Sequence, residues 1–214
     1  DLRHTDASGI RQTDKGTDFV ETAGESYKDS RTGRIADLTM DTHGVVSGIV
    51  TLTYVGAPAL AWRQRALRGD RAGLEHEFQT NMERMVPHGM DVKIVSIDHL
   101  TDYEQPLTVN FMLKGPVGEP TGKRLFVPSD IFMANAKPVF TSPKRDIPVY
   151  FDYPHIVQDA VRIKYPPAFS VESSPAAANI QFSNYAIYKV SSQSEANSIT
   201  YRRMSDDMDF NAGR

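Results

Sequence analysis

Residues 35–55 read IADLTMDTHGVVSGIVTLTYV, and this stretch decides the fold class of the chain. Val50, Leu52 and Tyr54 fall on one face of an extended segment, while the threonines between them fall on the other. Such alternation with a period of two is typical of a half-buried strand. The turn residues DTHG at 41–44 separate two segments of this kind. The stretch therefore predicts a β-hairpin.

The segment that follows predicts two helices near residues 58–86. Pro58 suits the first turn of the first helix, and Gly69 suits a position just after its end. Asp70 is a favourable N-cap for the second helix. The apolar residues of the second helix recur at helical spacing and predict one buried stripe, made of Leu74, Phe78, Met82 and Met85.

Beyond residue 87 the sequence returns to short alternating segments. In one of them, four apolar residues are expected to face inward: Leu107, Val109, Phe111 and Leu113. Seven or more such strands with a helical insertion are typical of a β-sandwich. We therefore predict a mainly β (α+β) fold, an antiparallel β-sandwich with a two-helix insertion, over residues 36–205.

The two ends of the chain differ from this predicted domain. Residues 1–35 are rich in Asp, Thr, Gly and Arg and lack periodicity, which predicts an irregular lead-in segment where only Phe19 and Val20 look buried. Residues 206–214 are polar and predict a frayed tail. The chain starts at Asp1 without an initiator Met, and we interpret it as a fragment of a longer polypeptide.

Composition excludes several classes of function. Hydrophobic residues make up 40% and charged residues 24% of the 214 residues, so the chain is too apolar for a disordered tail. The net charge is -3 with both signs interspersed, which argues against nucleic acid as a partner. The chain has no Cys, which excludes disulfides, thiolate metal sites and a cysteine nucleophile. No apolar run reaches the ~20 residues of a membrane span, and any export signal must lie upstream.

No standard motif for catalysis or cofactor binding occurs. The sequence has neither a glycine-rich phosphate loop nor a GxSxG elbow, and His76 has no second ligand one turn away. Asp152, His155 and Asp159 could form an acid–imidazole pair, and the polar group that starts at Asp98 could bind a hard cation. Polar turn residues after a strand are the simpler interpretation of both groups. We predict no catalytic residue, no metal and no cofactor.

One helix offers a candidate surface for a partner. Trp62, Arg63 and Arg65 lie on the first predicted helix, and aromatic and arginine residues are enriched where proteins meet. Tyr103 is a further candidate, in a polar stretch between two strands. The alternative is that Trp62 packs under the sheet and the arginines form a solvated face.

A resemblance to a known family rests on five segments: FVET, ADLTMDTHGVVSGIVTLTYVGAPA, WRQRALRGD, RDIPVYFDYP and SITYRRM. Together they resemble the C-terminal region of large exported bacterial proteins that carry a transglutaminase-like core preceded by a β domain of unknown function. The likeness spans roughly residues 18–204. Its markers are positions rather than chemical motifs: Gly44, Gly48, Gly56, Arg63, Arg65, Arg145 and Pro148.

The resemblance implies an extracytoplasmic location, periplasmic or secreted, and a supporting β domain. The Cys, His and Asp arrangement of the transglutaminase-like core cannot be carried onto a chain without Cys. We therefore expect a non-catalytic accessory or interaction domain, whose partner is the upstream transglutaminase-like domain of the same polypeptide.

Two other functions stay open at this point. One is a module that binds envelope glycans or peptides through exposed tyrosines and an open sheet edge. The other is a hydrolase whose Ser, His and Asp assemble from distant positions, with His99 or His155 as the imidazole.

Overall fold

The computed structural model describes residues 8–21, 28–137, 153–183 and 186–207. Two α-helices are present there, α1 (Ala57–Ala66) and α2 (Arg71–Met85), with a 3-10 turn, η2 (Ile131–Met133). The strands are β1 (Ser8–Thr13), β2 (Gly16–Glu21), β3 (Arg31–Met40), β4 (Val45–Val55), β5 (Asp91–Asp98), β6 (Leu107–Pro116), β7 (Glu119–Thr121), β8 (Arg124–Phe126), β9 (Ile156–Lys164), β10 (Ala178–Phe182), β11 (Ala186–Glu195) and β12 (Ser198–Asp207). The predicted mainly β, α+β class is confirmed.

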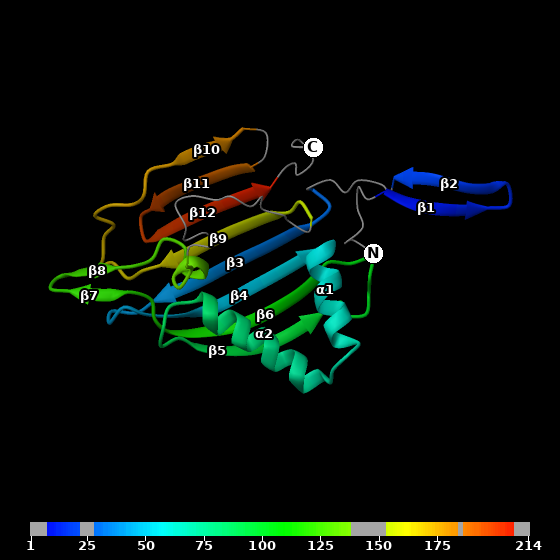
Figure 1. The fold of residues 1–214 in the computed structure, drawn as a ribbon. Coiled ribbons are helices and arrows are strands. Elements are labelled where there is room, and N and C mark those ends of the chain that lie inside the picture. The colour runs from blue at the N-terminus through cyan, green and yellow to red at the C-terminus, as the bar shows by residue number, and fades with distance from the viewer. Residues whose placement is uncertain (1–7, 22–27, 138–152, 184–185, 208–214) are drawn as a thin grey trace.

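Eight strands form one large sheet in the order β10-β11-β12-β9-β3-β4-β6-β5 (Figure 1). Its neighbouring strands are antiparallel, except that β3 and β9 run parallel. Both helices lie on one face of the sheet, over the part that includes β3 to β6. We call this the inner face, and the opposite side the outer face.

This arrangement corrects the predicted antiparallel sandwich. In the described residues, β1–β2 and β7–β8 are separate two-stranded ribbons, so no second large sheet packs on the first. Alternation along a strand shows only that one of its faces is buried, and it does not show what covers that face. Here the helices cover it. Neither helix of the described chain is long and apolar enough to cross a membrane.

The hairpin predicted from residues 35–55 is present as β3 and β4. The Asp41 carboxylate accepts hydrogen bonds from the backbone N–H groups of His43 (2.8 Å) and Val45 (3.0 Å), which closes the turn. Gly44 has φ of +81°, a conformation that favours glycine. At Gly48 a Cβ would lie 2.1 Å from the carbonyl oxygen of the facing strand. Two of the glycines that mark the family resemblance, Gly44 and Gly48, are therefore explained by backbone conformation and by lack of space for a side chain.

Both helices begin as predicted and contribute to the core. Asp70 is the N-cap of α2, and its carboxylate accepts a hydrogen bond of 2.6 Å from the Gly73 N–H. The four predicted inward residues of β6 are all fully buried. The predicted apolar stripe of α2 is confirmed, since three of its residues are buried in the core and the last packs beside them: Leu74, Phe78, Met82 and Met85.

The lead-in segment is not irregular throughout, which corrects the prediction. Residues 8–21 form a hairpin whose strands pair only with each other in the described sheets. The Phe19 side chain, expected to be buried, is 87% exposed and lies opposite Ile10 in the ribbon, while Val20 is partly exposed. A two-stranded ribbon can form without a buried face, so its sequence need not alternate between apolar and polar residues. The polar residues around Phe19 therefore give no periodic pattern that would predict a strand. The main sheet begins at Arg31, and β12 continues to Asp207.

Candidate functional site

The structure places Trp62 in the core. Its side chain is 6% exposed and stacks on Phe78, with ring centroids 3.9 Å apart, while the Tyr54 ring lies 6.2 Å away. Aromatic pairs at such distances add to the stability of a core. This corrects the interpretation of Trp62 as a surface residue and agrees with the alternative that it packs under the sheet.

Arg63 is also buried, and it holds the loop between β5 and β6. Its guanidinium donates hydrogen bonds to the carbonyl oxygens of His99 (2.9 Å), Gln105 (2.8 Å) and Asp102. The same guanidinium lies over the Tyr103 ring, 5.0 Å from its centroid. Arg63 therefore acts within the fold, which corrects its assignment to an exposed partner surface.

The other two predicted residues, Arg65 and Tyr103, are accessible at the surface. Arg65 lies over the Trp62 ring at 4.6 Å, and its guanidinium is 3.9 Å from the Glu77 carboxylate. Tyr103 is more than half exposed. The structure thus brings all four predicted residues close to α1, but it leaves only two of them accessible. A role for Arg65 and Tyr103 in binding a partner stays a prediction.

A cluster of four charged side chains lies on the inner face, where three of them are buried and Arg203 is partly buried. Asp159 of β9 accepts hydrogen bonds from Arg34 of β3 at 2.5 and 2.7 Å and from Arg203 of β12 at 2.7 Å. Arg203 also donates a hydrogen bond of 3.0 Å to Asp130, the residue before η2. We call Arg34, Asp130, Asp159 and Arg203 the charge cluster.

The sheet register explains why these charges meet. Arg34 is the parallel partner of Asp159, and Asp159 is the antiparallel partner of Arg203, so three strands carry one row of alternating charge. The Arg34 guanidinium also lies 5.1 Å from the centre of the Phe132 ring. Burial alone would raise the pKa of Asp159, but hydrogen bonds and charge from Arg34 hold that pKa below its ordinary value. The cluster therefore joins β3, β9, β12 and η2 electrostatically.

Asp130 behaves differently within the cluster. Burial, followed by the negative charge of Asp159, raises the pKa of Asp130 from 3.8 to about 6. Because this pKa is higher in the folded than in the unfolded chain, the resulting stability is fully present below pH 3.8 and is lost as the pH rises through about 6.

The Asp130→Asn variant tests this shift, because an asparagine side chain mimics the protonated acid without titrating. We expect the free energy of unfolding of the native protein to fall relative to that of the variant between about pH 5 and pH 7. Urea unfolding of both proteins at the two pH values measures the difference. A difference that does not change with pH would contradict the raised pKa.

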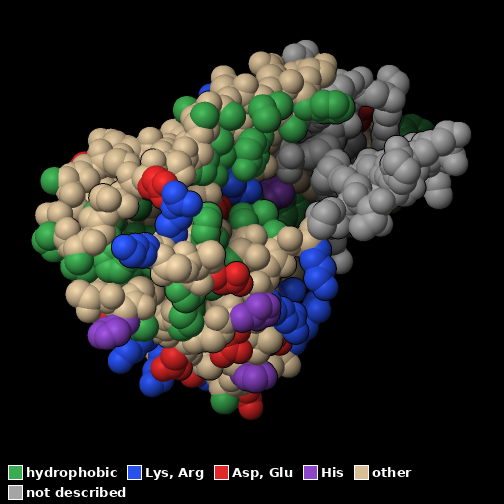
Figure 2. All heavy atoms as spheres, turned by 90° about the vertical axis from the view of Figure 1, so that its left-hand side faces the viewer, with side chains coloured by type: hydrophobic (Ala, Val, Ile, Leu, Met, Phe, Trp, Pro, Cys, Tyr) green, Lys and Arg blue, Asp and Glu red, His purple; other side chains and the backbone are tan. Residues whose placement is uncertain are grey.

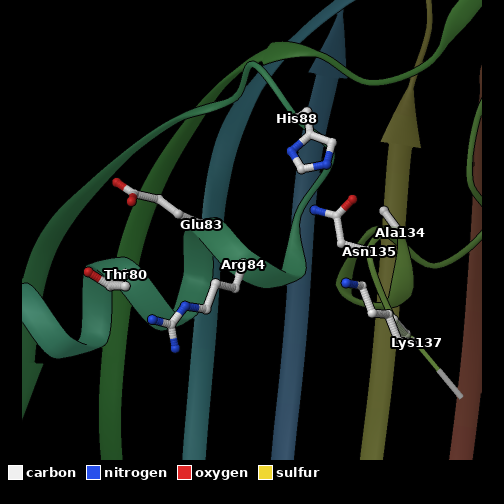
Figure 3. Close-up of a pocket in the computed structure, with 8 residues that line it drawn as sticks. Thr80, Glu83, Arg84, His88, Ala134, Asn135 and Lys137 are labelled. Carbon is white, nitrogen blue, oxygen red and sulfur yellow. The ribbon is translucent and has the colours of Figure 1, made fainter. Parts of the chain in front are cut away.

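A pocket of about 760 Å³, lined mostly by polar and charged residues, opens between α2 and the segment after η2. Figure 3 shows its lining residues on the two sides: Thr80, Glu83, Arg84 and His88 on and after α2, and Ala134, Asn135 and Lys137 opposite. The Asn135 amide donates a hydrogen bond of 2.6 Å to the Val86 carbonyl, which ties the two sides together. Glu83 accepts a hydrogen bond from Gln79, and no hydrogen bond joins the described Thr80, Glu83 and His88 side chains.

Of the acid–imidazole group considered from the sequence, Asp159 and His155 are not paired with each other in the described structure. Asp152 lies outside the described residues, and Asp159 is buried in the charge cluster. The His155 ring lies edge-on to the Tyr153 ring, with centroids 5.7 Å apart. Asp159 is therefore the counter-ion of two arginines of the sheet, Arg34 and Arg203.

The polar group after β5 does not bring three metal ligands together in the described structure. The His99 imidazole lies 4.0 Å from the Asp102 carboxylate, and both side chains are about half exposed. Among the residues that can be placed, no group of three or more His, Asp and Glu side chains could hold a metal ion.

An apolar patch lies on the inner face where the helices do not reach. It consists of Ile180 and Phe182 on β10 and Tyr188 on β11, which are 60%, 72% and 38% exposed. Ile180 and Tyr188 are direct partners across the strand pair, so their side chains share one face. Figure 2 shows hydrophobic side chains gathered in the upper part of the molecule, where β10 and β11 lie. We call these three residues the β10–β11 patch.

Residues 123–206 match a family described as a domain of unknown function with a solved structure (DUF3858). The match covers less than half of the chain, from β8 into β12. It includes the β10–β11 patch and three members of the charge cluster, whereas Arg34 lies outside it. Two markers of the sequence resemblance, Arg145 and Pro148, fall within the match but outside the described residues. No curated protein and no solved structure matches the chain.

Sequence reasoning missed the charge cluster, although a signal for it exists. Asp159 shares its face of β9 with Val161 and Ile163, and Arg34 shares its face of β3 with apolar core residues. A charged residue at an inward position of an alternating strand indicates a buried ion pair, because an unpaired charge there would be very costly.

Proposed function

We propose that this chain is a non-catalytic accessory domain that packs against another domain of a larger, exported protein with a transglutaminase-like core. The observation that best supports the proposal is the β10–β11 patch, an apolar part of the inner face that neither helix covers. Exposed, contiguous apolar surface of this kind marks interaction sites in soluble proteins. The extracytoplasmic location and the identity of the core rest on the sequence resemblance.

The way the sheet is covered supports an interface at this place. Over β3, β4 and β6, the buried apolar side chains form one core with residues of α1 and α2. On β10 and β11, the same face continues with apolar residues, and neither α1 nor α2 of the described chain covers it. A second domain that packs there would continue the layer of helices, which is how sheets usually bury an apolar face.

If the patch is the interface, two matched variants should differ in their affinity for the partner domain. Ile180→Asp places a charge at the centre of the patch. Val95→Asp places the same charge outside the patch, on β5, and the two native side chains are similarly exposed, 58% for Val95 and 60% for Ile180. We expect Ile180→Asp to weaken binding to a separately expressed transglutaminase-like core by at least about tenfold, because the binding energy of an interface concentrates in a few residues near its centre and a charge buried there without a partner is costly. Isothermal titration calorimetry measures both affinities.

The same titration separates the proposed function from its alternatives. Val95→Asp should bind as the native protein does, and thermal unfolding should show that both variants fold. Equal binding by Ile180→Asp and the native protein would overturn the patch as the interface. Failure of the native protein to bind the core would overturn the accessory role itself.

A peptide-binding function is the second candidate, and one observation favours it. β10 is at the edge of the eight-stranded sheet, so one side of its backbone has no strand partner among the described residues. Its sequence, ANIQF, carries no charge and no proline, the features that usually block pairing at an edge. Saturable binding of extended envelope peptides, without binding to the core, would favour this second function.

A further inference from the structure

A shallow groove of about 620 Å³ lies across the outer face of the sheet. Five strands contribute to it, β3, β9, β12, β11 and β10. Its lining includes Gly33 and Ala160, two small residues on adjacent strands, and the apolar side chains of Ile35 and Met204. The groove is on the opposite side of the sheet from the β10–β11 patch, because successive side chains of β11 alternate between the two faces. We call it the outer groove.

Two cations in the outer groove have no counter-ion among the described residues. Arg202 of β12 and Lys189 of β11 are exposed, and neither makes a salt bridge or side-chain hydrogen bond with a described residue. In the next two rows of the same face, by contrast, Arg162 and Lys164 both form ion pairs with Asp37. The outer face thus balances its neighbouring cations but leaves this pair available to an external anion.

The register sets the spacing of the two cations. Arg202 pairs with Ser191, and Lys189 pairs with Met204, so the two cations are diagonal neighbours on one face. Diagonal neighbours in a sheet lie about 7–8 Å apart. In an extended peptide, alternate side chains point the same way and their Cα atoms are about 7 Å apart. Two carboxylates at alternate positions of an extended peptide therefore match this cation pair.

We propose that the outer groove binds an extended acidic peptide segment with carboxylates at alternate positions. Gln158, Asn179 and Ser191 line the groove and offer amide and hydroxyl groups to the peptide backbone. The groove crosses four inter-strand spacings, about 19 Å, which an extended segment of about six residues spans. Ile35 and Met204 accommodate an apolar residue beside the acidic pair.

The lining of the outer groove favours a peptide over an acidic polysaccharide. Sugar rings are commonly held by stacking on aromatic side chains, and the residues that line this groove include none. Nucleic acid is equally poorly matched, because base stacking also needs aromatic side chains and a charged backbone needs a longer row of cations.

Fluorescence anisotropy with two labelled hexapeptides tests the proposal. One peptide has the form Val-Glu-Val-Glu-Val-Gly, and the other has Gln in place of both Glu residues. We expect the native chain to bind the acidic peptide, and a double variant, Arg202→Glu with Lys189→Glu, to bind it at least about tenfold more weakly, because like charges then face each other. Affinity should also fall as salt is added.

A matched control removes the effect of net charge alone. Arg68→Glu with Lys123→Glu makes the same charge change at exposed positions outside the groove and should leave the affinity unchanged. Equal weakening by both double variants, equal binding of the Gln peptide, or binding of polygalacturonate in place of the peptide would each overturn the proposal. Ile180→Asp lies on the inner face and should bind the peptide normally, so this result is independent of the accessory role.

Discussion

Asp159→Ala is expected to lower the free energy of unfolding by about 3–5 kcal/mol, because removal of one member of a buried ion pair leaves its partners charged and unpaired. Asp159 is 3% exposed and is bonded to two arginines that come from different strands. Without its carboxylate, Arg34 and Arg203 would face each other across β9 with only Asp130 as a counter-ion.

Urea unfolding of the native chain and the variant measures this loss. Asp37→Ala is the control, since Asp37 forms ion pairs with Arg162 and Lys164 on the outer face, where both partners are about half exposed. Exposed pairs contribute roughly 0–1 kcal/mol, so the control should be nearly neutral. Similar losses in the two variants would show that the charge cluster does not hold the sheet together.

Trp62→Ala is expected to cost about 3–5 kcal/mol of stability, as removal of a large aromatic side chain from a core usually does. Trp62 fills the space between α1 and the inner face, in contact with Phe78 and close to Tyr54. Its loss would leave a cavity between the two helices and the sheet.

The comparison with Arg65→Ala shows whether Trp62 acts in the core or at an interface. Arg65 lies over the same indole ring but is half exposed, so its removal should cost less than about 1 kcal/mol. Chemical unfolding gives the stabilities, and calorimetry with the transglutaminase-like core gives the affinities. A Trp62→Ala protein of native stability but with reduced affinity would contradict the core assignment.

Local features of the fold were predictable because their signals lie within a few residues. The alternation in residues 45–55 reflects the pleat of one strand, and the turn at 41–44 needs only an aspartate and a glycine to close. The stripe Leu74, Phe78 and Met82 follows from 3.6 residues per turn. None of these signals depends on what the element packs against.

The sandwich prediction failed because it concerned the packing of elements against one another, which local patterns do not specify. An inward row such as that of β6 is equally satisfied by a second sheet or by two helices, since both remove apolar surface from water. The parallel pairing of β3 with β9 joins residues 125 positions apart at Arg34 and Asp159, and no local pattern encodes a contact over that separation.

The candidate sites divide in the same way. Trp62, Arg63, Arg65 and Tyr103 were chosen by residue type, yet burial separates the first two from the others, and burial is a property of the assembled layers. By itself, the sequence determined the β3–β4 hairpin, the two helices, the mainly β class and the absence of Cys chemistry, because periodicity and composition are local. Only the tertiary structure decided the single sheet, the charge cluster, the β10–β11 patch and the outer groove, because each of them depends on strands far apart in the chain being brought into register.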